Sequence, residues 1–99
     1  MISNQILLNT IEGLKAIARI DFCVMDTDGK EVASTLADLA QCGLEVAGFA
    51  LSPADSQEIR GCQYFKIFDE QQLEYVLVAA GADEDAYVMG KIAAFQIQN

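Results

Sequence analysis

The segment DTDGKE, residues 26–31, has three carboxylates around a glycine, so it is a candidate for metal binding or for catalysis by carboxylates. A calcium loop of the EF-hand type needs oxygen ligands at positions one, three and five, glycine at six and glutamate at twelve. Counted from Asp26, position five is Lys30 and position twelve is Ala37, so the match fails after two ligands. The spacing alone leaves a pair of catalytic carboxylates open. An Asp-Gly pair between apolar runs predicts instead a tight hairpin turn.

Other catalytic and metal-binding chemistry has little support in the composition. The sequence contains no histidine, which removes the commonest general base and the Ser-His and Cys-His nucleophile pairs. Its three cysteines, Cys23, Cys42 and Cys62, are far apart and include no CxxC pair, so a zinc site is not expected. We expect three free, buried thiols in a reducing compartment. The expectation is therefore no enzyme, no cofactor and no metal.

The charge balance argues against nucleic acid and membrane partners. The chain has a formal net charge of −9, from fifteen acidic and six basic side chains. Binding to phosphates or to an anionic bilayer needs clustered Lys and Arg, whereas these six are scattered. No apolar run approaches the roughly 18 residues that a spanning helix needs, and no basic region precedes an apolar block at the N-terminus. We expect a cytoplasmic domain.

The periodicity of apolar residues predicts both helices and strands within one domain of 99 residues. The strand over 73–80 is apolar on both faces, which is typical of a central strand. The predicted elements are a helix from its cap Ser3 to about Arg19, strands over 20–25 and 30–34, a helix over 36–50 capped by Thr35, strands over 56–60, 63–68 and 73–80, and a helix that begins after Asp83.

The last predicted helix has two features of its own. A stripe of mostly small residues lies beside a larger apolar stripe, and small residues allow two helices to approach closely, so we expect a homodimer through the terminal helices. No stop signal occurs near Asn99, which predicts a fragment of a longer chain. The two stripes are Ala86, Gly90, Ala93 and Ile97, and Val88, Ile92 and Phe95.

The fold class that follows is α+β. One five-stranded antiparallel sheet with N- and C-terminal helices, in the order α-β-β-α-β-β-β-α, hides the apolar residues. This is the PAS/GAF/profilin-like layout of sensor domains, and it is also the layout of the roadblock family of small dimeric scaffolds. The fold alone does not choose between these two functions.

A family resemblance rests on three stretches of running sequence: NQILLNTIEGLKAIARIDFCVMDTDGKEVAST (residues 4–35), SPADSQEIRGCQYFKIFDEQQLEYVLVAAG (52–81) and DEDAYVMGKIAAFQIQN (83–99). Together they resemble the N-terminal segment of bacterial sugar diacid utilisation regulators, of the carbohydrate diacid regulator type. The resemblance implies that residues 1–99 form a single PAS-like sensory domain that binds a sugar diacid or small carboxylate. It also implies a DNA-binding helix-turn-helix domain further along the chain.

Such a ligand needs cations, and arginine is the best bidentate partner for a carboxylate. We expect the pocket on the concave sheet face under the second helix, with Arg60 and Lys66 as carboxylate partners. Ser56, Ser34 and Thr35 would add hydroxyl groups, and the N-terminus of the second helix would add backbone donors. In the alternative interpretation, the two cations are solvated charges that protect an edge strand.

Two functions therefore compete. The first is a ligand-sensing domain of a transcription regulator, in which binding biases the sheet and the terminal helices between two arrangements. The second is a roadblock-like dimerisation scaffold that binds no small molecule.

Overall fold

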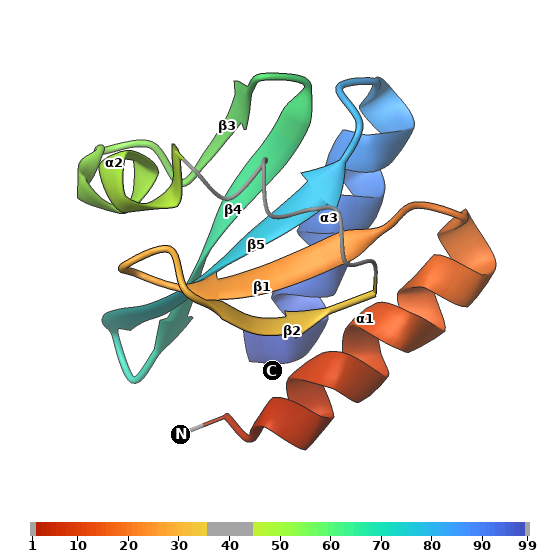
Figure 1. The fold of residues 1–99 in the computed structure, drawn as a ribbon, viewed down its shortest axis with the longest axis horizontal. Coiled ribbons are helices and arrows are strands. Elements are labelled where there is room, and N and C mark those ends of the chain that lie inside the picture. Colours follow the sequence, from red (N-terminus) through yellow and green to blue (C-terminus); the bar gives the residue numbers. More distant parts are fainter. Residues whose placement is uncertain (1, 36–44, 99) are drawn as a thin grey trace.

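The computed structural model describes residues 2–35 and 45–98, which form one sheet with helices on both faces (Figure 1). The α+β class and the predicted order of elements are confirmed. In chain order the elements are α1 (Asn4–Ala18), β1 (Phe22–Asp26), β2 (Glu31–Ser34), α2 (Val46–Leu51), β3 (Ser56–Ile59), β4 (Cys62–Asp69), β5 (Gln72–Ala80) and α3 (Glu84–Gln98).

The sheet has the order β2-β1-β5-β4-β3, and every neighbouring pair is antiparallel. The strand β5 is central, as its two apolar faces predict, and its Leu77 pairs with Val24 of β1 and Phe65 of β4. The two edge strands, β2 and β3, have four residues each. Short edge strands expose few unpaired backbone groups, which limits pairing with other chains.

Each face of the sheet has its own apolar core. The helices α1 and α3 cover one face and α2 covers the other (Figure 1). Leu7 of α1 and Phe65 of β4 belong to the first core, whereas Phe49 of α2 and Tyr64 of β4 belong to the second. Phe65 and Tyr64 are adjacent in sequence and point to opposite faces, because side chains alternate along a strand.

The helix α1 begins and ends where its sequence predicts. The Ser3 hydroxyl accepts a hydrogen bond from the Ile6 N–H at 3.1 Å and caps the first turn. At the other end, Arg19 adopts a left-handed conformation with φ 59°, and its N–H donates to the Lys15 carbonyl at 2.8 Å. The capping signal at Ser3 therefore places the start of this helix, and the left-handed backbone at Arg19 ends it.

The DTDGK segment is a hairpin turn between β1 and β2, as predicted. Gly29 has φ 90°, which favours glycine. The Asp26 carboxylate accepts hydrogen bonds from the N–H groups of Asp28 and Lys30, each at 2.9 Å. This carboxylate therefore holds the turn in shape.

The second helix, predicted over 36–50, is described only in its C-terminal part. Residues 36–44, where it was predicted to start, lie outside the described residues, and the described helix is α2, Val46–Leu51. The first and third predicted strands need correction. The strand β1 starts at Phe22 instead of residue 20, and β3 ends at Ile59, so that Arg60 belongs to a turn with φ 52°. Arg60 ends β3 because a residue with positive φ cannot continue a strand. The strand β1 starts later because its ladder with β5 begins at the pair Phe22 and Ala79.

The small-residue stripe of α3 packs against the sheet of its own chain. Ala86, Gly90 and Ala93 are buried. A Cβ atom built on Gly90 would lie 2.3 Å from Cε2 of Phe65, so this position has room only for glycine. The close approach that small residues permit therefore takes place between α3 and β4, and the expectation that this stripe supports a dimer is wrong. The neighbouring stripe, which includes Phe95, faces outward.

None of the helices in the described part of the chain has the length and apolar content that crossing a bilayer requires.

Two glycine substitutions test the packing of α3. Gly90→Ala should destabilise the domain by about 1–3 kcal/mol, because the new methyl group overlaps the Phe65 ring. Gly13→Ala in α1 should stabilise it by about 0.5–1 kcal/mol, because nothing lies within 4 Å of that position and alanine favours helix. Urea unfolding measures both. Equal effects of the two substitutions would contradict the close contact between α3 and β4.

The turn between β4 and β5 predicts a stabilising change. Glu70 and Gln71 both have positive φ, 52° and 70°, in a two-residue loop that favours Asn-Gly. Replacing them by Asn-Gly should raise the free energy of unfolding by about 1–2 kcal/mol, because left-handed backbone is costly for most residues. As a control, Gly61→Ala in the β3–β4 turn should lower it, because Gly61 has φ 79°. A loss of stability in the Asn-Gly variant would contradict this assignment.

Candidate functional site

The five residues expected to bind a ligand lie at opposite edges of the sheet. Ser56 and Lys66 lie on β3 and β4, at one edge, and Arg60 lies in the turn that joins these strands. Ser34 ends β2 and Thr35 follows it, at the other edge. The structure therefore does not bring the five residues into one pocket, and their role in binding stays a prediction.

Arg60 is engaged at the surface. Its side chain is 71% exposed, and its Nε lies 3.1 Å from Oε1 of Glu45. An exposed ion pair of this kind contributes little to stability. Because Arg60 occupies the turn and Lys66 lies four residues into β4, the two cations do not line the same cavity.

The sheet face under α2, where the pocket was expected, is packed with side chains. The rings of Phe49 and Tyr64 meet edge to face, with centroids 5.6 Å apart and planes at 67°. Tyr64 is fully buried, and burial raises the pKa of its hydroxyl. Val46 and Val78 belong to the same core. The concavity predicted on this face is therefore occupied by the protein itself.

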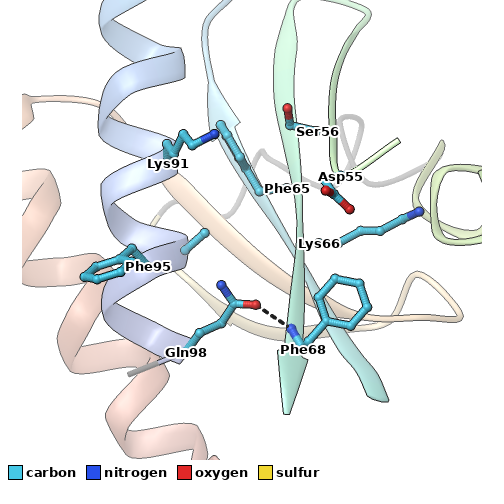
Figure 2. A pocket seen from close by; sticks show the side chains of 9 residues that line it. Asp55, Ser56, Phe65, Lys66, Phe68, Lys91, Phe95 and Gln98 are labelled. Carbon is cyan, nitrogen blue, oxygen red and sulfur yellow. Dashed lines mark hydrogen bonds between the residues drawn. The ribbon is translucent and has the colours of Figure 1, made fainter. Parts of the chain in front are cut away.

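A groove opens instead on the α3 side of the sheet, along its β3–β4 edge, between α3 and these two strands (Figure 2). Its volume is about 280 Å³. The helix contributes Lys91, Ala94, Phe95 and Gln98, which recur at helical spacing on one side of α3. The strands and the residue before them contribute Asp55, Ser56, Phe65, Lys66 and Phe68.

Strand register explains how Ser56 reaches this groove. Ser56 pairs directly with Phe65, so the two side chains lie on the same face of the sheet, toward α3. Further along β4 the register shifts between Ile67 and Phe68. The Phe68 N–H at this irregularity donates to Oε1 of Gln98 at 2.8 Å, which ties the end of α3 to β4 (Figure 2).

The two lysines of the groove differ in how much binding capacity they have left. The Lys66 side chain runs away from α3 (Figure 2), where its ammonium group donates to the Ser52 carbonyl and lies 5.2 Å from the Phe49 ring centroid. Lys91 is exposed, and within the described part of the chain its ammonium donates to the Tyr87 hydroxyl at 3.4 Å and lies 5.7 Å from that ring centroid. Both ammonium groups keep donors, but Lys91 is exposed and lies at the α3 side of the groove, whereas Lys66 is half-buried and points away, so Lys91 is the lysine placed to bind an anion there (Figure 2).

Sequence reasoning missed Lys91 as a site residue. The signal that was available is the spacing of Lys91, Ala94, Phe95 and Gln98, which places them on one side of a helix. That spacing does not show which strand this side of the helix faces. Only the packing of α3 on β4 brings Lys91 to the same groove as Ser56.

A second hollow, of about 530 Å³, lies beside α1 and is lined by Glu12, Lys15, Ala16, Arg19 and Thr35. Asp21 binds two of the residues that line this hollow. Its Oδ1 lies 2.7 Å from Nζ of Lys15 and accepts a hydrogen bond from the Thr35 hydroxyl at 2.8 Å. The Thr35 hydroxyl also accepts the Phe22 N–H at 3.0 Å. Thr35 was expected to cap a helix and to bind ligand, and in the structure its hydroxyl joins the start of β1 to the end of β2.

The cysteines have different environments. Cys23 is a free, buried thiol, and its burial, with a smaller effect of Glu31, raises its pKa to about 11. It is therefore protonated near neutral pH and is not a nucleophile in the folded domain. Cys62 is disulfide-bonded, so the expectation of a free thiol is wrong for this residue. Cys42 lies outside the described residues.

Within residues 2–35 and 45–98, no group of three or more His, Cys, Asp or Glu side chains is placed to hold a metal ion. Comparison of the chain with models of protein families and with curated proteins finds no match.

The environment of Asp21 predicts a pH dependence of stability. The hydrogen bond from Lys15 lowers the Asp21 pKa, so the carboxylate stabilises the fold above its unfolded pKa of about 3.9. This contribution is lost as the pH falls through the lower folded pKa. Asp21→Asn should cost less than about 1 kcal/mol at pH 7, and the cost should fall at pH 2–3. Urea unfolding at both pH values measures this, and Glu74→Gln, at an exposed position of β5, is the control. An equal cost of Asp21→Asn at both pH values would contradict the assignment.

Proposed function

We propose that this domain senses a small carboxylate within a cytoplasmic transcription regulator. The observation that carries the proposal is the groove between α3 and the β3–β4 edge, which combines the Lys91 ammonium and the Ser56 hydroxyl with apolar side chains. A cation and hydroxyl beside an apolar surface are the groups that orient a small acid in a pocket. The sugar diacids implied by the family resemblance are one class of such acids.

The groove is placed so that a ligand would affect the position of α3. Lys91 and Gln98 of α3 and Ser56 of β3 all line it, so a bound acid would contact both the helix and the sheet. The Gln98 side chain already joins the end of α3 to Phe68. A ligand that prefers one position of α3 would shift the population toward it. A DNA-binding domain further along the chain would receive this change.

The alternative function, a dimerisation scaffold without a ligand, is favoured by one observation. The outward stripe of α3 exposes Val88, Ile92 and Phe95, of which Phe95 is 63% exposed. Contiguous exposed apolar side chains commonly mark protein interaction sites. The two functions are compatible, because a dimer formed through this stripe would leave part of the groove open.

Thermal denaturation with glucarate, galactarate, glycerate and simple dicarboxylates tests the sensing proposal. A ligand at ten times its Kd should stabilise the domain by about 1.4 kcal/mol and raise Tm by about 5–10 °C. Lys91→Met should reduce this rise, whereas Lys30→Met, in the turn between β1 and β2, should not. If none of these acids changes Tm and light scattering shows a stable dimer, the sugar diacids are excluded as ligands and the scaffold function is favoured.

A further inference from the structure

We infer that the preferred ligand of the groove is a monocarboxylate with an aromatic or short aliphatic body. This inference rests on the proposed sensing function and narrows the class of acid that the groove accepts. It follows from the number of charges and polar groups that remain available for a ligand and from the apolar side chains between them.

The charges of the groove suit one carboxylate better than two. The Lys91 ammonium is exposed and has donors to spare. The Lys66 ammonium is already bound to the Ser52 carbonyl and lies against the Phe49 ring. Asp55 belongs to the strand side of the same lining, so this side offers a second ligand carboxylate an acidic residue instead of a further free cation. A diacid would therefore leave one of its charges without a partner.

The polar groups of the groove are too few for a polyhydroxylated chain. The Ser56 hydroxyl is one partner, and the Oε1 atom of Gln98 already accepts the Phe68 N–H. Sugar hydroxyl groups that lose water without gaining a hydrogen bond weaken binding. An acid with an apolar body has no such groups to satisfy.

The apolar side chains of the groove offer a surface for such a body. Phe65 and Ala94 form its buried part and Phe68 remains 39% exposed, whereas the Phe95 ring points away from β4 (Figure 2). A ring or short alkyl chain laid against these side chains would remove apolar surface from water on both sides. With the carboxylate on Lys91, at the α3 side, the body would extend across the groove toward Phe68 of β4 (Figure 2).

Binding of 3-phenylpropionate, its neutral amide and glucarate to the whole 99-residue chain tests this inference, by calorimetry at low salt and by amide NMR shifts. We expect the phenylpropionate to bind at least about tenfold more tightly than the amide, because one charge-assisted hydrogen bond is lost, and more tightly than glucarate. Its shifts should map to residues 65–68 and 91–98. Lys91→Met should weaken binding of the acid about tenfold and leave binding of the amide unchanged, whereas Lys30→Met should change neither affinity.

The outcomes separate the two proposals. Tighter binding of glucarate than of phenylpropionate, with dependence on Lys91, overturns the monocarboxylate inference and retains sensing at this groove. Equal binding of phenylpropionate and its amide also overturns the inference, and this comparison needs no variant. Absence of binding by any of the acids overturns both the inference and the sensing function.

Discussion

The contact between Gly90 and the Phe65 ring determines where α3 lies. Because Gly90 has no side chain, the helix backbone can lie directly against a phenyl ring of β4. The rest of the helix follows from this contact. Its small residues are directed inward, and Lys91 lies on the side of the helix that lines the groove. The groove exists because α3 is held close to β4 while the short edge strand β3 ends the sheet beside it.

Three of the six described cations in this acidic chain bind another segment of the chain. Lys15 is paired with Asp21, Arg60 with Glu45, and Lys66 with a backbone carbonyl. Each of these contacts joins two residues that do not belong to the same helix or strand. A cation used in this way has less capacity for a ligand, because its charge is already neutralised or its donors are occupied. This is why the position of a lysine in the fold matters more than its position in the sequence.

The central strand β5 explains why neither face of the sheet is available for a large cavity. Its side chains are apolar on both faces, so each face must be covered by helices and filled by their side chains. On one face Phe49 and Tyr64 fill the space under α2. The space left for a ligand lies at the edge of the sheet, where fewer neighbouring strands and helices can supply side chains.

The sequence by itself determined the features that depend on neighbouring residues. The cap at Ser3, the hairpin turn at Asp26 and the central position of β5 follow from local hydrogen bonds or from side-chain alternation, and all three are confirmed. Only the tertiary structure decided which distant residues meet. Ser56 and Lys91 line the same groove, whereas Thr35 lies at the opposite edge of the sheet. The physical reason is that alternation along a strand specifies which face a side chain occupies, while its neighbours depend on strand order, register and the packing of helices across the sheet.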